Sequence, residues 1–375
     1  MKRPLTLDIT RLLLRRRHAT PTGIDRLELA YARALLGAQD RPVAFEAWVP
    51  GIGACGYSRA ALAALLPRIE ARWAAGEPSG IALSGLRPRV RREGEVRLLV
   101  SHHHLAELDR RHRPDAKTCV YVHDAIPADF PEYARPGGAE KHERRLRNAA
   151  RFADGILVNS HATAASLARF LEARRPPLLV APLGVEPRFA GAAPEVQDRP
   201  YFLCLGTIEP RKNHLLLLQV WRALAGGGDA PRLILVGRRG WENENVVDML
   251  ERSPAIRALV VEAGRVGDAR LAGLVAGARA VLMPSFAEGF GLPVAEALAA
   301  GVPVIASDLP ALRETGGDVP DYLDPLDGPG WMQAIRDYAA PGSARRAAQL
   351  DRLGHWSPPG WDAHFDAVLP FLDGL

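Results

Sequence analysis

Two glutamates, spaced eight residues apart around a pair of glycines, are the side chains of this chain best placed to do chemistry. The segment 284–296 follows the apolar run 280–283 and leads into an alanine-rich stretch. Two glycines with one residue between them let backbone N–H groups approach an anion at a strand-to-helix turn. Glu288 before that helix and Glu296 within it add carboxylates that accept hydrogen bonds from hydroxyls. Amides and carboxylates together suit a sugar nucleotide, which carries both phosphates and hydroxyls.

A second candidate group is the adjacent cation pair Arg211 and Lys212, which follows the apolar run 201–205 and a Gly-Thr turn ending at Thr207. Two cations at the carboxyl end of a strand suit a diphosphate leaving group, because they neutralise charge that grows as a glycosidic bond breaks. Cations at a helix N-terminus oppose the helix dipole, so this placement favours binding over a solvated surface. With these cations present, we expect the site to need no divalent metal.

Other patterns have competing interpretations. His123 ends an apolar strand, where ligand-facing side chains collect, although a hydrogen-bonded structural histidine also fits. Residues 51–56 match a dinucleotide fingerprint letter for letter, but they do not lie at the first strand–turn–helix, and Pro50 precedes them. The three histidines 102–104 are consecutive, so their side chains cannot easily converge on one metal. We therefore expect neither NAD nor a metal.

These candidates need a scaffold of alternating strands and helices, and the second half of the chain shows one. Continuous apolar runs separated by helical patterns predict a parallel, doubly wound sheet. In such a sheet the ligand binds outside the carboxyl ends of the strands, where the candidates lie. Strands are expected at 201–206, 232–237, 259–264, 280–285, 303–308 and 322–323, with helices at 214–225, 243–252, 268–278, 292–300 and 310–315.

The first half is also α/β, with less regular spacing. Residues 22–25 resemble a capping box and begin an amphipathic helix. We place a first domain at 1–190, a second at 191–355 and a last helix within 356–375, with the hinge at 186–199. In the first domain, strands are expected at 5–10, 43–49, 96–101, 118–124, 155–160 and 178–185.

Bulk composition agrees with two domains in a reducing compartment. A chain of 375 residues with 47% hydrophobic content supports two cores. There is neither an apolar stretch of transmembrane length nor the apolar core of a signal peptide at the start. The three cysteines (Cys55, Cys119 and Cys204) are widely spaced, which favours free thiols. We expect a cytoplasmic protein.

Charge is unevenly distributed along the chain. Residues 1–190 hold 31 Lys and Arg against 20 Asp and Glu, whereas the remainder holds 17 against 23. This asymmetry indicates an anionic partner for the first half, either a membrane surface or a lipid diphosphate, with a solvated basic surface as the alternative. Nucleic acid is disfavoured, because no aromatic-interleaved basic stripe accompanies the charge. The first candidates for such contacts are Arg15, Arg16 and Arg17, followed by Arg144, Arg145 and Arg147.

The segment 284–296 resembles the Glu-x7-Glu motif of retaining glycosyltransferases of family 4. Segments 201–214, 266–268 and 301–307 are similar to other parts of the second domain in that family. The resemblance covers about residues 200–320 and, loosely, the first half. It implies the GT-B fold, in which two Rossmann-like, doubly wound parallel-sheet domains face a central cleft. It also implies that the last helix crosses back to the first domain.

The resemblance assigns roles to individual residues. It places Glu288 and His123 at the donor sugar, Arg211 and Lys212 at the diphosphate, and Glu296 at the nucleotide ribose. Gly23 matches the family's glycine loop after the first strand, although this chain has only one of the usual paired glycines. The remaining residues expected to contact the nucleotide sugar are Thr207, Val266, Gly289, Phe290, Gly291 and Leu292.

Together these features predict a retaining hexosyltransferase. It would move a sugar from a nucleotide diphosphate sugar, with GDP-mannose favoured, to a lipid-linked glycan acceptor in bacterial surface polysaccharide biosynthesis. By resemblance, the mechanism is front-face displacement, in which the leaving phosphate helps to deprotonate the acceptor. We expect the protein to lie peripherally on the inner face of the cytoplasmic membrane. A sugar-nucleotide epimerase of the same architecture and a non-catalytic sugar-nucleotide-binding protein stay open as alternatives.

Overall fold

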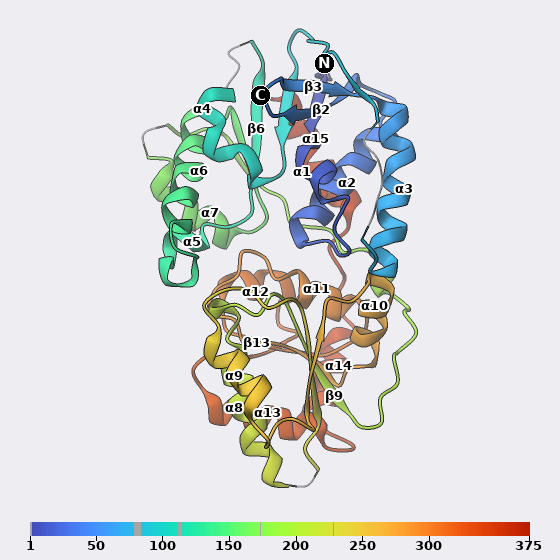
Figure 1. Ribbon diagram of the computed structural model, residues 1–375, viewed down its shortest axis with the longest axis vertical. Helices are drawn as coiled ribbons and strands as arrows, with labels where there is room; N and C mark the ends of the chain where they lie inside the picture. The colour runs from blue at the N-terminus through green and yellow to red at the C-terminus, as the bar shows by residue number, and fades with distance from the viewer. Residues whose placement is uncertain (1, 79–83, 112–114, 173, 228) are drawn as a thin grey trace. The chain divides into compact units, whose positions relative to one another are not determined.

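The computed structural model describes residues 2–78, 84–111, 115–172, 174–227 and 229–375 (Figure 1). The chain forms two compact units. Unit 1 comprises Met1–Gly184 and Gly360–Leu375, and unit 2 comprises Val185–Pro359. These boundaries lie within a few residues of the domain limits expected at 190 and 355. The chain thus leaves unit 1, builds unit 2 and returns to complete unit 1.

Unit 1 is built on an eight-stranded sheet in the order β4-β3-β2-β1-β5-β6-β7-β8. The β2–β3 and β3–β4 pairs are antiparallel, and the other pairs are parallel. The parallel sheet implied by the resemblance is therefore extended at this edge by two antiparallel strands, β3 and β4. The strands are β1 Leu5–Asp8, β2 Val43–Val49, β3 Gly53–Tyr57, β4 Leu86–Arg87, β5 Val96–Leu99, β6 Lys117–Val122, β7 Gly155–Val158 and β8 Leu178–Val180.

The antiparallel edge begins at a glycine turn between β2 and β3. Gly51 and Gly53 have φ values of 80° and 98°, a region that side chains disfavour, and Ile52 between them is 76% exposed. The letters of the dinucleotide fingerprint therefore belong to a hairpin, not to a parallel strand that leads into a helix. The next helix starts only at Arg59, after β3, where Ser58 caps it.

The helices of unit 1 include α2, which begins as the sequence predicted. The Thr22 side chain accepts from the Asp25 N–H, and Asp25 in turn accepts from the Thr22 N–H at 2.7 Å. Leu27, Tyr31 and Leu35 are buried on its apolar face. The helices are α1 Thr10–Arg15, α2 Gly23–Gly37, α3 Arg59–Ala75, α4 Leu108–Arg111, α5 Ile126–Asp129, α6 Gly138–Phe152, α7 His161–Leu167 and α15 Trp361–Asp373.

The last helix, α15, packs within unit 1. His364 Nδ1 donates to the Pro182 carbonyl at 2.8 Å, so its Nε2 accepts from the Tyr31 hydroxyl, also at 2.8 Å. Arg41 donates two hydrogen bonds to the Asp373 carboxylate, at 2.9 and 2.8 Å. These contacts tie residues that are far apart in sequence, and α15 completes the interior of unit 1.

A buried ion-pair network links strands β2 and β5 of the unit 1 sheet to the segment before β5. Glu46 on β2 accepts from Arg97 on β5 at 2.7 Å and from Arg89. Arg89 also donates to Glu95 at 2.7 Å. All four side chains are at most 10% exposed. Because each charge has a partner, the network satisfies groups that would otherwise be costly to bury.

Unit 2 holds a six-stranded, fully parallel sheet in the order β11-β10-β9-β12-β13-β14. The doubly wound sheet that the sequence predicted is confirmed here, with strand limits shifted by only a few residues. The strands are β9 Tyr201–Leu205, β10 Arg232–Val236, β11 Val260–Gly264, β12 Ala280–Met283, β13 Val304–Ser307 and β14 Asp321–Leu323.

Helices cover both faces of the unit 2 sheet (Figure 1). Alternate residues of β9 enter opposite cores: Leu203 lies in one cluster, and Phe202 and Cys204 lie in the other. Both faces are therefore apolar, which explains the continuous hydrophobic runs in the sequence. The helices are α8 His214–Leu224, α9 Glu244–Arg252, α10 Asp268–Gly277, α11 Leu292–Ala299, α12 Pro310–Gly316, α13 Gly328–Ala339 and α14 Ala344–Leu353.

Candidate functional site

The candidate site of unit 2 lies at the carboxyl ends of β9 and β12. These strands are neighbours, yet the chain continues from β9 to β10 on one side and reaches β12 on the other only later. Open α/β sheets bind ligands at such a reversal of strand order, because the two following loops diverge and leave a crevice. Arg211 and Lys212 follow β9 in the short helix η5 (Pro210–Lys212), and Glu288 follows β12.

Glu288 joins the two predicted cations. Its Oε1 accepts from Lys212 Nζ at 2.5 Å and from the Ser285 hydroxyl at 2.7 Å, while Oε2 accepts from Arg211 Nη1 at 3.0 Å. The side chains of Glu288 and Lys212 are only 7% and 9% exposed. The chain has four lysines in all, and Lys212 is the one that lies in residues 185–359. The ion pair with Glu288 explains why this lysine can be buried.

The cations keep the buried Glu288 carboxylate ionised. Burial alone raises its pKa, but the charges of Lys212 and Arg211 and the hydrogen bonds from Lys212 and Ser285 outweigh it and lower the pKa to about 2. The stabilisation from this pairing is therefore present above pH 4.5 and is lost as the pH falls toward 2. At neutral pH Glu288 accepts hydrogen bonds and has no proton to donate.

Glycines bring the backbones around Lys212 close together. A Cβ on Gly237, at the end of β10, would lie 1.7 Å from the Gly206 carbonyl oxygen, so only glycine fits. Gly206 itself has a φ of 140°, and a Cβ there would lie 3.2 Å from Lys212 Cε. The chain can therefore turn sharply after β9 and place the lysine directly over the strand end.

The predicted glycine turn forms the start of α11. Gly291 is the residue before the helix, with a φ of 93°, and a Cβ there would lie 2.4 Å from Leu312 Cδ2. Pro293 occupies the first turn, as the sequence predicted. Gly289, Phe290 and Leu292 lie in the same turn, where helix N-terminal amides attract anions.

The remaining predicted residues of unit 2 lie on neighbouring segments. Glu296 lies in the second turn of α11 and is 6% exposed. Thr207 is partly exposed between β9 and η5. Val266 precedes α10, and its side chain belongs to the hydrophobic core, so its backbone is the part available to a ligand. The structure thus brings Arg211, Lys212 and Glu288 into direct contact. It places the other predicted residues on α11 and on the loops before η5, α10 and α11.

The sequence reasoning missed residues that hold this group in position. Glu209 accepts from Arg211 Nε at 2.6 Å, and Ser285 bonds to Glu288. Asn213, with a φ of 53°, donates to the carbonyls of Pro284 and Pro325 and so fastens the loop after β9 to the loop after β12. Glu209 lies two residues before Arg211 and Ser285 three residues before Glu288, spacings that could have signalled both contacts. The carbonyls that Asn213 contacts come from distant segments.

His214 is a further residue that the sequence reasoning missed. It begins α8, directly after Asn213, and is 2% exposed. Burial and the Lys212 charge lower its pKa to about 3, so the ring is neutral. Neither ring nitrogen has a hydrogen-bond partner among the described residues.

The two candidates of the first half, His123 and Gly23, both lie in unit 1. His123 follows β6 and is 7% exposed, and its Nε2 donates to the Val100 carbonyl at 2.8 Å. Burial lowers its pKa to about 4, although this hydrogen bond and Asp124 raise it. Gly23 is the first residue of α2, behind the Thr22 cap. Ser160, also in unit 1, caps α7 by accepting from the Thr163 N–H.

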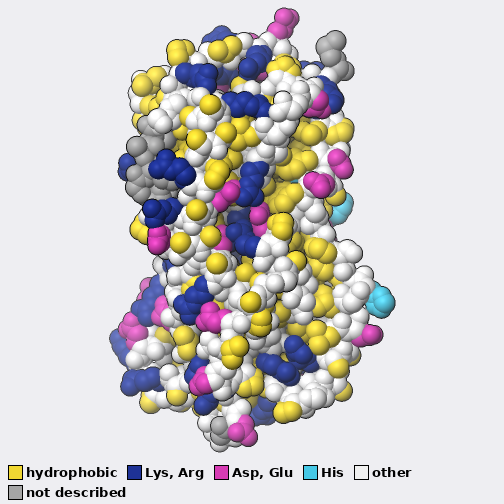
Figure 2. Space-filling view, turned by 90° about the vertical axis from the view of Figure 1, so that its right-hand side faces the viewer, with side chains coloured by type: hydrophobic (Ala, Val, Ile, Leu, Met, Phe, Trp, Pro, Cys, Tyr) yellow, Lys and Arg dark blue, Asp and Glu magenta, His cyan; other side chains and the backbone are white. Residues whose placement is uncertain are grey.

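The basic residues proposed to contact a membrane differ in their surroundings. Arg15 pairs with the fully buried Asp25 at 3.0 Å, and Arg16 is only 4% exposed and donates to the Leu13 carbonyl. The expectation that residues 15–17 form an exposed cationic patch is therefore wrong for these two, because they stabilise the local fold. Arg17, Arg144 and Arg147 are exposed. On the face that Figure 2 shows, basic and acidic side chains are interleaved.

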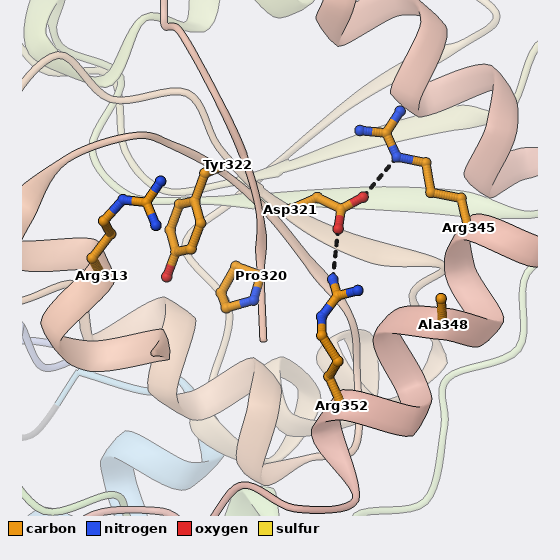
Figure 3. Close-up of a pocket in the computed structure, with 7 residues that line it drawn as sticks. All are labelled: Arg313, Pro320, Asp321, Tyr322, Arg345, Ala348 and Arg352. Atoms are coloured by element: carbon orange, nitrogen blue, oxygen red, sulfur yellow. Dashed lines mark hydrogen bonds and ion pairs between the residues drawn. The ribbon is translucent and has the colours of Figure 1, made fainter. Parts of the chain in front are cut away.

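No helix among the described residues combines the length and the apolar character needed to cross a membrane. Unit 2 also has an open pocket of about 450 Å³ beside its edge strand β14 (Figure 3). Its cations are already paired: Asp321 accepts from Arg345 and Arg352, each at 2.7 Å, and Arg313 pairs with Asp308 and covers the Tyr322 ring. These internal pairings leave the loops after β9 and β12 as the better candidate site.

Part of the chain is similar to known glycosyltransferases. Residues 199–339 match the family model described as glycosyl transferases group 1. The O-antigen chain mannosyltransferase B of Escherichia coli is 44% identical over 131 residues, which cover 34% of this chain and 33% of that protein. The serotype-specific mannosyltransferase WbdA of Escherichia coli is 28% identical over 229 residues, which cover 56% and 28%. The chain thus spans about a third or less of the curated relatives that it matches.

Solved structures extend the likeness of fold to the full chain. Anabaena Alr3699/HepE in complex with UDP-glucose has a TM-score of 0.66 at 16% identity, covering 100% of both chains. Sucrose-phosphate synthase from Thermosynechococcus elongatus has a TM-score of 0.64 at 17% identity, covering 97% of this chain and 96% of that one. Residues 199–339 thus match the glycosyl transferases group 1 family, and the fold of the chain is the GT-B fold.

Proposed function

We propose that this protein is a retaining glycosyltransferase that moves mannose from GDP-mannose to a lipid-linked glycan during assembly of a bacterial surface polysaccharide. The observation that carries the proposal is the buried contact of Lys212 and Arg211 with Glu288 at the point where the strand order of unit 2 reverses. The choice of mannose is supported by relatives named as mannosyltransferases. The structural neighbour in complex with UDP-glucose makes a UDP-sugar the donor to test against it.

The arrangement suits transfer better than acid–base hydrolysis. Hydrolysis by a carboxyl pair needs one carboxyl that holds a proton near neutral pH. Glu288, with a pKa of about 2, is ionised there and serves instead as an acceptor for sugar hydroxyls. Lys212 Nζ has three protons, and its one hydrogen bond to Glu288 leaves further donors for phosphate oxygens. In this proposal the two cations stabilise the departing diphosphate, and the amides at the start of α11 assist them.

The direct test is incubation of the purified protein with GDP-mannose or UDP-glucose, with and without a glycan acceptor, followed by analysis of the sugar and the released nucleotide. A transferase forms product only with acceptor present, an epimerase changes the sugar without acceptor, and a binding protein does neither. We expect acceptor-dependent release of GDP. Conversion without acceptor, or stable binding alone, would replace the proposal with one of these alternatives.

The first prediction concerns the buried lysine. Replacing Lys212 by Ala removes a preorganised cation at the developing charge, so turnover should fall by roughly 10²–10³-fold, or about 2.7–4 kcal/mol of transition-state stabilisation. Because the change also leaves Glu288 short of a partner, urea unfolding should be measured alongside. The double variant Lys212→Met/Glu288→Gln removes both charges and should fold well yet stay inactive. Arg222→Ala, an exposed cation on α8, serves as the control. Near-normal turnover in folded Lys212→Ala would contradict the assignment.

The second prediction separates the two glutamates. Glu296→Ala should mainly weaken nucleotide binding, because ribose contacts act equally in the ground and transition states. Glu288→Ala should mainly lower kcat while GDP is held at least as tightly, since Lys212 and Arg211 lose a competing anion. Steady-state kinetics and GDP calorimetry on both variants provide the measurement. The opposite pattern would mean that the two roles are exchanged.

The third prediction is that transfer continues in EDTA. Two cations already lie at the strand ends where a diphosphate would bind, so they can supply the charge that a divalent metal supplies elsewhere. Initial rates should be equal before and after chelation. Complete loss of activity that Mg²⁺ or Mn²⁺ restores would overturn the metal-free proposal.

The fourth prediction concerns location. We propose reversible docking of unit 1 on the cytoplasmic face of an anionic membrane, with Arg144 and Arg147 on α6 among the contacts because both are exposed. Each cation near such a surface contributes about 1 kcal/mol. Co-sedimentation should show binding to anionic vesicles at low salt, release as salt rises, and weaker binding by Arg144→Glu/Arg147→Glu. Equal absence of binding to anionic and neutral vesicles would point to a soluble acceptor.

A further inference from the structure

Arg145 on α6 is a half-buried cation without a counterion. Among the described residues its guanidinium has neither a hydrogen bond nor an ion pair, and its Nε is buried and unpartnered. Burying an unpaired charge is costly, so proteins almost always supply a partner from the chain or from a ligand. Burial lowers the pKa of Arg145, and Asp124 only partly offsets this. An anion that contacts the Arg145 guanidinium would supply the missing partner.

The groups around Arg145 are a second arginine and three histidines. His142 lies one turn before it on the same face of α6, and the His142 and His102 ring centroids are 5.2 Å apart. His102 in turn lies 4.8 Å from the His123 ring. The charges of Arg11 and Arg145 both act to lower the pKa of His102, for which burial is the main cause. We call Arg11, His102, His123, His142 and Arg145 the Arg145 cluster.

The carboxylates near the Arg145 cluster do not balance it. Asp25 is shared between Arg11 and Arg15, at 2.8 and 3.0 Å, and also closes the capping box of α2. Asp124 accepts from the Ile126 N–H at 3.2 Å and lies 3.9 Å from His142 Nε2. Two arginines on Asp25, together with Arg145, leave an excess of positive charge in this part of unit 1.

The hydrogen bonds within the cluster leave one imidazole N–H, that of His102, available to donate to a ligand. The backbone N–H of His123 donates to His102 Nε2 at 3.0 Å, so this nitrogen carries no proton and Nδ1 must carry it. His123 uses its Nε2 proton on the Val100 carbonyl. His102 therefore offers an Nδ1–H donor within the Arg145 cluster, without any change of charge.

The cluster lies where a Rossmann-like sheet binds ligands. Arg11, His102 and His123 follow β1, β5 and β6, which are three consecutive strands in the order of the unit 1 sheet. Their carboxyl ends share one edge, and ligands of such sheets bind beyond that edge. The cluster belongs entirely to unit 1, whereas Lys212 and Arg211, the cations proposed for the donor diphosphate, belong to unit 2.

We propose that the Arg145 cluster binds a phosphoryl group, and that in transfer this group is a phosphate of the acceptor's diphosphate. The assignment to the acceptor rests on the proposed function, whereas binding of a phosphoryl group by the cluster does not. A phosphate dianion matches the planar guanidinium fork of Arg145 and accepts from His102 Nδ1. Its negative charge offsets the positive charge of Arg11, Arg15 and Arg145 that Asp25 and Asp124 do not balance. The cluster would thus position a lipid diphosphate acceptor while unit 2 holds the donor.

The first experiment measures binding of inorganic pyrophosphate in the Lys212→Met variant, which lacks the donor-site lysine. Calorimetry should show saturable binding, and the His102 imidazole resonances should shift on titration. Arg145→Gln should weaken this binding at least tenfold. Arg151→Gln, an exposed arginine on the same helix, should leave it unchanged. If Arg145→Gln folds poorly, Arg145→Lys, which keeps the charge but not the fork, should still bind more weakly than the parent.

The second experiment identifies the source of the phosphoryl group. Transfer from GDP-mannose is compared for one glycan with and without a polyisoprenyl diphosphate. Arg145→Gln should raise KM for the phosphorylated acceptor alone and leave KM for GDP-mannose unchanged. An equal rise for both acceptors would reduce Arg145 to a structural role and overturn the acceptor assignment.

The two experiments also separate this inference from the proposed function. Absence of saturable pyrophosphate binding, or equal binding by Arg145→Gln, overturns the phosphoryl site even if mannose transfer is observed. Pyrophosphate binding that depends on Arg145 in a protein without transferase activity would uphold the site and refute its use by an acceptor.

Discussion

The contact of Glu288 with Lys212 and Arg211 is the interaction on which the candidate site depends. It joins the loops after β9 and β12, two strands that are neighbours in the sheet but far apart in the sequence. Each partner makes burial of the other tolerable, since a lone buried charge would be expelled or neutralised. The same contact restrains the cations, because any phosphate must share them with Glu288. Gly206 and Gly237 lack the Cβ atoms that would crowd this contact, so it can form close to the sheet.

Unit 1 holds one buried acid that is accommodated differently. Glu28 is fully buried, and both of its carboxylate oxygens lack hydrogen-bond partners among the described residues. Burial and the neighbouring Asp8 raise its pKa well above the usual value, and burial raises the pKa of Asp8 to about 6. Glu288 is thus held charged by cations, whereas burial favours the neutral form of Glu28. These two buried carboxyls are accommodated by opposite means.

Much of unit 2 could be predicted from sequence because its strands are buried on both faces. A continuous apolar run such as 280–283 has few alternatives to a parallel strand, and its polar successor must then lie at the ligand edge. The sequence therefore pointed to Arg211, Lys212 and Glu288. It did not show that they bond to each other, because side-chain pairing across loops has no local signal. The contacts of Asn213 with Pro284 and Pro325 were missed for the same reason.

Unit 1 was harder to predict because its sheet is mixed and its interior is polar. The strand Gly53–Tyr57 contains two glycines and no aliphatic alternation, so propensity gave no sign of it. Arg15 and Arg16 were interpreted as surface charge, yet one is committed to Asp25 and the other is buried. An arginine-rich composition hides such cases, since a guanidinium that organises the fold looks the same in the sequence as one that faces water.

The return of the chain to unit 1 has a consequence for synthesis on the ribosome. Unit 2 is continuous in sequence, so it is complete before α15 has been made. Until then Tyr31 and Arg41 lack the partners that His364 and Asp373 provide, and the apolar side of α15 is missing from the interior of unit 1. The unit begun first should therefore be finished last, and a nascent chain arrested before residue 360 should have a protease-resistant unit 2 beside a loosely closed unit 1.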